Sequence, residues 1–103
     1  MNSKIVNPET ANLFKAIMSL KTVDECYMFF EDLCTVNEIL SMGQRFEVAK
    51  RLKTGDTYTE IKEKTGASSA TISRVNRSYL YGNDAYKLVF ERIKEPEEQQ
   101  KNQ

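Results

Sequence analysis

The chain has 103 residues with 15 basic and 15 acidic side chains, so its formal net charge is zero and gives no overall attraction to nucleic acid or membranes. A chain of this length forms one domain with a modest core. It has no histidine, no apolar run near the roughly 20 residues of a membrane span, and no apolar signal segment after Lys4. Cys26 and Cys34 are about 12 Å apart along one predicted helix, too far for a disulfide, so we expect reduced thiols in the cytoplasm.

Helical spacing of apolar residues dominates the chain and no alternating strand pattern is present, so we predict an all-α fold with six helices. The first helix begins with Asn7 as its cap and Pro8 at its first position. Three later helices begin with a capping box, a threonine followed three residues on by glutamate: Thr22 with Glu25, Thr35 with Glu38, and Thr57 with Glu60. The third helix ends at Gly55.

The second half of the chain contains two short helices and a final one. A turn at Gly66 separates the short helices, Ser68 caps the second of them, and the last helix covers residues 83–95 before Pro96 stops it. We expect disorder in residues 1–6 and in the polar tail 96–103. The prediction is therefore one helical domain over residues 7–95.

The residues of common catalytic and metal sites are absent. Without histidine or a Cys/His cluster, zinc sites and Ser-His or Cys-His triads are excluded, and no Gly-rich phosphate loop exists. The neighbouring carboxylates Glu31 and Asp32 fit an ordinary solvated helix face. We therefore expect neither an enzyme nor a cofactor or metal site.

The stretch TYTEIKEKTGASSATISRVNR, residues 57–77, has the pattern of a helix-turn-helix. Serine and threonine are poor residues for a helix that needs only stability, so a helix beginning SSATIS favours short polar side chains that approach a partner closely. Counted from Gly66, the inward residues are apolar or small: Ile61, Thr65, Ala67, Ile72 and Val75. The exception to the pattern is Lys62, where a small residue is usual. The alternative is a generic helical hairpin with a solvated polar face.

Charge is distributed unevenly along the neutral chain. Residues 45–77 carry eight basic and four acidic groups, a net of +4, whereas residues 1–44 carry three basic and six acidic groups, a net of −3. The positive part therefore coincides with the predicted helix-turn-helix, where a phosphate backbone would lie. This favours DNA binding.

The segment EIKEKTGASSATISRVNRS resembles the helix-turn-helix of the Trp repressor superfamily, and the upstream LCTVNEILSMGQRFEVAKRLKTG resembles that family's central helices. The chain is most similar to the TrpR-related YerC/YecD proteins, and the lysine at position 62 is shared with the family. The resemblance implies an intertwined all-α homodimer. The second predicted helix agrees with this, because it is apolar on more than one side. Candidates for the shared surface are Phe14, Met28, Phe29 and Phe90.

The resemblance implies a sequence-specific DNA-binding transcriptional regulator on a pseudo-palindromic operator, and it favours repression. Eight residues are expected to bind DNA: Lys53, Thr59, Lys62, Ser68, Ser69, Ala70, Ser73 and Arg77. Two alternatives remain at this stage. One is a helical protein-interaction module, and the other is the DNA-binding subunit of a transposase-like system.

The resemblance also suggests a ligand pocket and a reason to doubt its use. In the Trp repressor two arginines and a threonine hold tryptophan, and a glycine beside the second arginine leaves room for the indole ring. The matching residues here are Thr35, Arg45, Arg74 and Ser78. The glycine is replaced by Val75, which would fill the space of the ring. We therefore expect no tryptophan corepressor.

Overall fold

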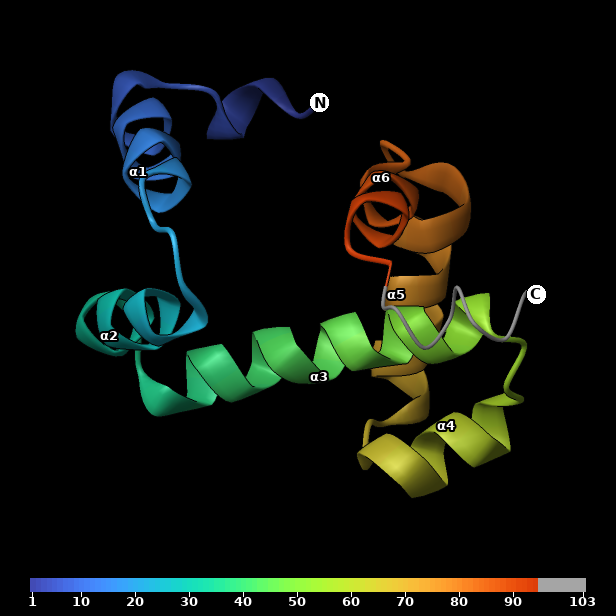
Figure 1. The fold of residues 1–103 in the computed structure, drawn as a ribbon. Helices are drawn as coiled ribbons and strands as arrows, with labels where there is room; N and C mark the ends of the chain where they lie inside the picture. The colour runs from blue at the N-terminus through green and yellow to red at the C-terminus, as the bar shows by residue number, and fades with distance from the viewer. Residues whose placement is uncertain (95–103) are drawn as a thin grey trace. The chain divides into compact units, whose positions relative to one another are not determined.

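The computed structural model describes residues 1–94, and residues 95–103 lie outside the described part. The elements are a 3-10 helix η1 (Ser3–Ile5) and the helices α1 (Pro8–Met18), α2 (Val23–Leu33), α3 (Val36–Lys53), α4 (Tyr58–Thr65), α5 (Ser69–Tyr81) and α6 (Ala85–Arg92) (Figure 1). The predicted all-α fold with six α-helices is thus confirmed. The chain divides into two compact units, Met1–Ser41 and the part from Met42 onward, and α3 runs through the boundary as one helix.

Local side-chain caps determine where the helices of the first unit begin. Asn7 accepts a hydrogen bond from the Thr10 amide at 2.9 Å, and the Thr10 hydroxyl accepts one from the Asn7 amide at 3.2 Å. Thr35 and Glu38 form the predicted capping box, with bonds of 2.8 and 3.1 Å. The hydrogen bond from the Thr35 amide, and to a smaller extent the one with the Thr35 hydroxyl, stabilises the Glu38 carboxylate and lowers the pKa of Glu38.

The first residues of the chain form a short helical turn. Residues 1–6, for which disorder was predicted, contain the turn η1, because the Asn2 side chain caps it and the Thr10 hydroxyl donates to the Ile5 carbonyl. These bonds satisfy backbone groups that a disordered segment would leave to water. The predicted tail 96–103 and the stop at Pro96 lie outside the described residues.

The first unit has helices with apolar faces but no buried residue. Phe14 is 54% exposed, Tyr27 68% and Met28 67%, while Phe29 is half-buried. In a single chain this unit therefore has no core of its own. Large exposed apolar patches of this kind mark interaction surfaces.

The second unit has the core of the molecule. Its buried residues come from four helices and the turn between two of them: Val48, Ala49, Ile61, Ala67, Ile72, Val75 and Phe90. Phe46 packs on this core, with its ring centroid 5.3 Å from that of Phe90. Phe90 is only 6% exposed in the single chain, and its place on a surface shared between chains stays a prediction. Its own chain already covers the ring.

Helix α6 is shorter than the predicted span of residues 83–95. Asp84 adopts a left-handed conformation with φ of 60°, so it interrupts the helical backbone before Ala85. At the other end Ile93, with φ of −104° and ψ of 23°, leaves the helical region after Arg92. Val89 and Ile93 are 38% and 51% exposed in the single chain.

Candidate nucleic-acid interface

The end of α3 leads into α4 through a tight turn centred on Gly55. The Asp56 amide donates to the Arg51 carbonyl and the Gly55 amide donates to the Leu52 carbonyl, at 3.1 Å each. Gly55 has φ of +87°, and this bonding pattern is the Schellman motif, in which a left-handed glycine ends a helix. Thr57 then caps α4 together with Glu60, as predicted.

A second left-handed glycine connects α4 to α5. Gly66 has φ of 74° and its amide bonds the Lys62 carbonyl at 2.9 Å, while Ser68 caps α5 by accepting from the Thr71 amide at 3.1 Å. The Thr65 hydroxyl donates to the Ile61 carbonyl and accepts from the Ala67 amide, so it stays within the turn. The elements α4, turn and α5 therefore form a helix-turn-helix.

The inward and outward division of this motif agrees with the predicted periodicity. Ile61, Ala67, Ile72 and Val75 are at most 3% exposed, and Thr65 is half-buried. The predicted DNA-binding residues of the motif are all exposed: Thr59, Lys62, Ser68, Ser69, Ala70, Ser73 and Arg77. The exposed face of α5 thus carries small hydroxyl and methyl groups over a fully buried inner face.

Two of the eight predicted DNA-binding residues already have partners within the chain. The Ser68 hydroxyl lies 3.0 Å from that of Thr71 and also caps α5. Lys53 is the last residue of α3, and its ammonium lies 5.3 Å from the centroid of the Phe90 ring, a cation–π distance. Both groups are exposed but less free than Ser69 or Lys62.

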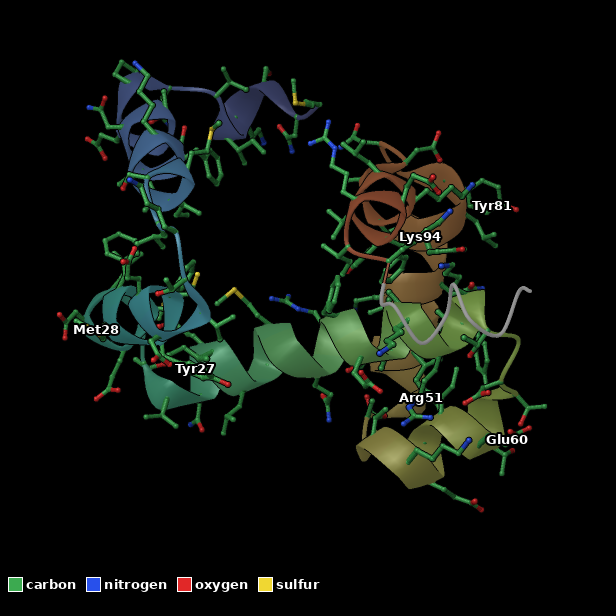
Figure 2. All side chains as sticks on the ribbon, in the orientation of Figure 1. Tyr27, Met28, Arg51, Glu60, Tyr81 and Lys94 are labelled. Atoms are coloured by element: carbon green, nitrogen blue, oxygen red, sulfur yellow. The ribbon has the colours of Figure 1, made fainter. Side chains whose placement is uncertain are left out.

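A network of charged groups connects α3, the loop after it and α4. Asp56, with a side chain only 17% exposed, accepts from Arg51 at 3.4 Å and from Lys64 at 3.3 Å. Arg51 reaches from α3 toward α4 (Figure 2), and its Nε lies 3.1 Å from Glu47, an ion pair without the geometry of a hydrogen bond. Lys64 also approaches Glu60 at 4.0 Å. This network was not predicted from the sequence, because its central pairs depend on the turn at Gly55.

A hydrogen bond connects the last turn of α4 to α3. The Gln44 amide donates to the carbonyl of Thr65 at 3.1 Å, in a partly buried position. Thr65 is the last residue of α4, where helical carbonyls lack a partner within the helix. Gln44 therefore holds the last turn of α4 to α3, while Arg51 holds the loop residue Asp56 that precedes α4. The contact by Gln44 was also not predicted from the sequence.

The positive charge of residues 45–77 is more available than the sequence count suggests. Arg51 and Lys64 are the two basic groups of this segment that pair with acids, and they engage Glu47, Asp56 and Glu60. The other six make no ion pair with any acidic group of residues 1–94: Arg45, Lys50, Lys53, Lys62, Arg74 and Arg77. An electrostatically free set of this kind can neutralise phosphates.

The residues of the predicted ligand pocket have different environments. Arg45, Arg74 and Ser78 are exposed in the second unit, whereas Thr35 belongs to the first unit and its hydroxyl caps α3. Val75 is only 3% exposed and is part of the core. Val75, which follows Arg74 in the sequence, thus fills buried volume in the core.

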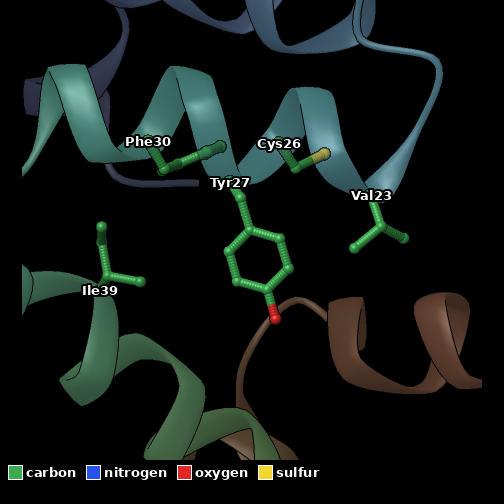
Figure 3. A pocket seen from close by; sticks show the side chains of 5 residues that line it. All are labelled: Val23, Cys26, Tyr27, Phe30 and Ile39. Atoms are coloured by element: carbon green, nitrogen blue, oxygen red, sulfur yellow. The ribbon is translucent and has the colours of Figure 1, made fainter.

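Two hollows lie elsewhere on the chain, an apolar one and one with a mixed polar and apolar lining. One, of about 190 Å³, is lined by Val23, Cys26, Tyr27 and Phe30 of α2 and by Ile39 of α3 (Figure 3). The other, of about 140 Å³, is lined by residues of α3, the following turn and α6: Phe46, Glu47, Lys50, Lys53, Thr54, Phe90 and Ile93. Among residues 1–94 no cluster of His, Cys, Asp or Glu side chains could hold a metal ion. No helix of this part is long and apolar enough to cross a membrane.

The described residues form six α-helices, and α4 and α5 among them form a helix-turn-helix. These features are those of an all-α helix-turn-helix protein. The family model of the Trp repressor protein matches residues 9–94. The chain belongs to the Trp repressor family, and its members are regulators, not enzymes.

Relatives and solved structures agree with this assignment. The chain is 55% identical over 94 residues to the "Uncharacterized protein YerC" of Bacillus subtilis (strain 168), covering 91% of this chain and 90% of that protein. It is similar to the crystal structure of a TrpR like protein from Eubacterium eligens ATCC 27750, with a TM-score of 0.87, 63% identity, and coverage of 89% of this chain and 95% of that one. A structure from Staphylococcus aureus has a TM-score of 0.86 at 52% identity, covering 88% and 91%.

Proposed function

We propose that the protein is a sequence-specific DNA-binding transcriptional regulator that reads the major groove with α5. The observation that carries this proposal is the exposed Ser69, Ala70 and Ser73 face on a helix whose opposite face is buried. Hydroxyls donate to or accept from base edges, and the alanine methyl packs on a thymine methyl. Since hydroxyls discriminate bases less sharply than bidentate arginine or asparagine, water and DNA shape carry part of the specificity.

The regulator is proposed to act as a homodimer. The support is the first unit, in which no residue is buried although α1 and α2 expose Phe14, Met18, Tyr27 and Met28. A two-fold dimer presents two α5 helices to half-sites one DNA turn apart, about 34 Å, on a pseudo-palindromic operator. Selection of bound sequences from a random DNA pool tests binding and half-site spacing together, and recovery of no enriched sequence would contradict the proposal.

Salt dependence provides a quantitative test of the phosphate contacts. If Lys53, Lys62 and Arg77 each neutralise one phosphate per subunit, a dimer makes about six contacts. The slope of log K, the logarithm of the DNA-binding constant, against log salt concentration is then expected to be about −5. Fluorescence anisotropy with selected DNA measures it. Replacing Arg77 by glutamine removes two contacts per dimer, so the slope is expected to become shallower by about 1.8.

The matched control is Lys87→Gln. Lys87 is on α6 and pairs with Asp84 at 3.4 Å, so its loss is expected to leave the slope unchanged. A slope near zero for the unmodified protein would favour the alternative, a helical module whose polar hairpin contacts another protein. A DNA-binding subunit of a transposase-like system would retain the slope, but it would select DNA ends rather than an internal palindrome.

We expect no tryptophan binding and a DNA affinity that is independent of tryptophan. Val75 is buried in the core, where its side chain contributes roughly 1.5–3 kcal/mol of apolar burial and holds α5 without a ligand. The exposed Arg45 and Arg74 are then free to meet phosphates. Calorimetry with tryptophan, followed by DNA titration with and without it, checks this. Heat of binding together with a tenfold gain in DNA affinity would be incompatible with the prediction.

A further inference from the structure

Asp56, in the loop between α3 and α4, contacts basic groups of both helices through one carboxylate oxygen. Its Oδ2 lies 3.4 Å from a guanidinium nitrogen of Arg51 on α3 and 3.3 Å from the ammonium of Lys64 in the last turn of α4. The Asp56 side chain is only 17% exposed. Isolated surface ion pairs contribute little to stability, whereas networks of several charges contribute more. Asp56 therefore connects α3 and α4 electrostatically.

The turn at Gly55 determines where this carboxylate lies. The Asp56 amide donates to the Arg51 carbonyl at 3.1 Å, and Gly55 has φ of +87°. Asp56 thus binds Arg51 through both its backbone and its side chain. The carboxylate is therefore held in place by contacts within one chain.

Helix α4 depends on such polar contacts because little of it is buried. The buried residue among its eight is Ile61, which belongs to the same core as Val48 of α3. A helix this short has little stability of its own. The bond from Gln44 to the Thr65 carbonyl holds it at one point, and the ion pairs of Asp56 hold it at another. The orientation of α4, and of α5 after the next turn, thus depends on one apolar side chain and a few polar groups.

The same ion pairs oppose DNA binding if charge alone is considered. Arg51 and Lys64 are two of the eight basic groups of residues 45–77, and Asp56 is one of the four acidic groups. An acid that pairs with two cations weakens the positive potential that phosphates meet. The charge of Asp56 therefore does not explain its place next to the helix-turn-helix, whereas its geometry does.

We infer that Asp56 is a positioning residue for the reading of DNA: it holds α4 on α3 and so sets the orientation in which α5 meets the major groove. The inference rests on the proposed function and adds to it a residue that acts through the two helices it connects. It also gives a physical reason for the expected independence from tryptophan, because these ion pairs hold the helix-turn-helix without a ligand.

Asp56→Asn tests this inference by the sign of its effect. The amide has nearly the shape of the carboxylate but no charge, so residues 45–77 would carry eight basic and three acidic groups, a net of +5 instead of +4. Charge alone would tighten binding to any DNA. If Asp56 positions α5, the affinity for selected DNA, measured by fluorescence anisotropy, is expected to fall about tenfold, because α5 loses its alignment with base edges. The affinity for random-sequence DNA is expected to stay equal or to rise.

The ratio of these two affinities distinguishes positioning from a general role in the fold. A variant that lost its fold would lose affinity for both kinds of DNA. Circular dichroism is expected to show the helix content of the wild type. Amide hydrogen exchange of α4 in the free protein should become faster, while exchange at Val48 and Ala49 in the core stays slow.

Glu63→Gln is the matched control. Glu63 is exposed on α4 and makes no ion pair with any basic group of residues 1–94, so its replacement gives the same change of charge without breaking the contacts of Asp56. It is expected to keep the wild-type ratio of affinities for selected and random DNA. Asp56→Glu retains a carboxylate and is expected to restore most of that ratio.

Each outcome decides the inference, and its failure differs from a failure of the proposed function. If Asp56→Asn keeps the wild-type ratio, the inference is overturned and the proposed function stands. Parallel loss of both affinities together with helix content also overturns it, because Asp56 would then serve the fold and not the orientation of α5. A wild-type protein that does not prefer selected over random DNA overturns the proposed function and the inference together.

Discussion

Replacing Ser69 by glutamate is expected to reduce the affinity for selected DNA about a hundredfold or more while the protein stays folded. Ser69 is the exposed first residue of α5, the part of the helix that enters the groove in the proposed complex. A carboxylate there faces phosphates of like charge and accepts no hydrogen bond from the backbone of DNA. Like-charge juxtaposition costs several kcal/mol, and about 2.7 kcal/mol corresponds to a hundredfold in affinity.

The same substitution should not harm the helix. A negative side chain in the first turn interacts favourably with the positive end of the helix dipole, by roughly 0.3–1 kcal/mol. Thermal unfolding is therefore expected to stay at the wild-type temperature or above it. Folding and binding respond in opposite directions, which isolates the DNA-reading role of this position.

Two companion variants complete the experiment, which uses a gel shift with the selected DNA. Asn83→Glu adds the same charge at an exposed position between α5 and α6 and is expected to change affinity severalfold at most. Ser69→Ala removes the hydroxyl without adding charge and should cost about tenfold, roughly 1–2 kcal/mol. Unchanged binding by Ser69→Glu would show that this face does not contact DNA.

The parts of the motif that depend on local chemistry could be predicted from the sequence. The left-handed conformations of Gly55 and Gly66 and the caps at Thr57 and Ser68 require only residues within one turn. Once Gly66 fixed the start of α5, the helical period determined which residues of α5 are buried. The exposure of Ser69 and Ser73 follows from that period.

Contacts between distant segments could not be predicted in the same way. The bond from Gln44 to the Thr65 carbonyl joins positions 21 residues apart, and no periodicity links them. The sequence indicates only an ordinary turn residue at Asp56, yet in the structure its carboxylate forms ion pairs with both Arg51 and Lys64. Such pairs depend on the placement of α4 against α3, which is decided by packing of the apolar core.

The conformation of Asp84 is another feature that could not be predicted from the sequence. Aspartate is one of the few residues that tolerate a left-handed backbone, but the same residue is also a common helix cap. In the structure it occupies the cap position of α6 without making a side-chain cap bond. The sequence therefore predicted a longer helix, because it could not distinguish these two roles.

The largest effect on stability is expected from Ile72→Ala. Ile72 is fully buried in the core of the second unit and lies on α5. Truncating a buried isoleucine to alanine removes apolar contacts and leaves a cavity, at a cost of about 2–5 kcal/mol. That is a large part of the roughly 5–15 kcal/mol that stabilises a typical domain.

Urea unfolding at one fixed protein concentration measures this loss, and Ser73→Ala is its control. Ser73 is the next residue of α5 and is exposed, so the control should shift the free energy of unfolding by at most about 0.5 kcal/mol. Because Ile72 supports the face that carries Ser69 and Ser73, its truncation should also weaken DNA binding, whereas Ser69→Glu weakens binding alone. If Ile72→Ala cost less than about 1 kcal/mol, the residue would not pack as the structure has it, and α5 would lack the rigid support that the proposed reading of DNA requires.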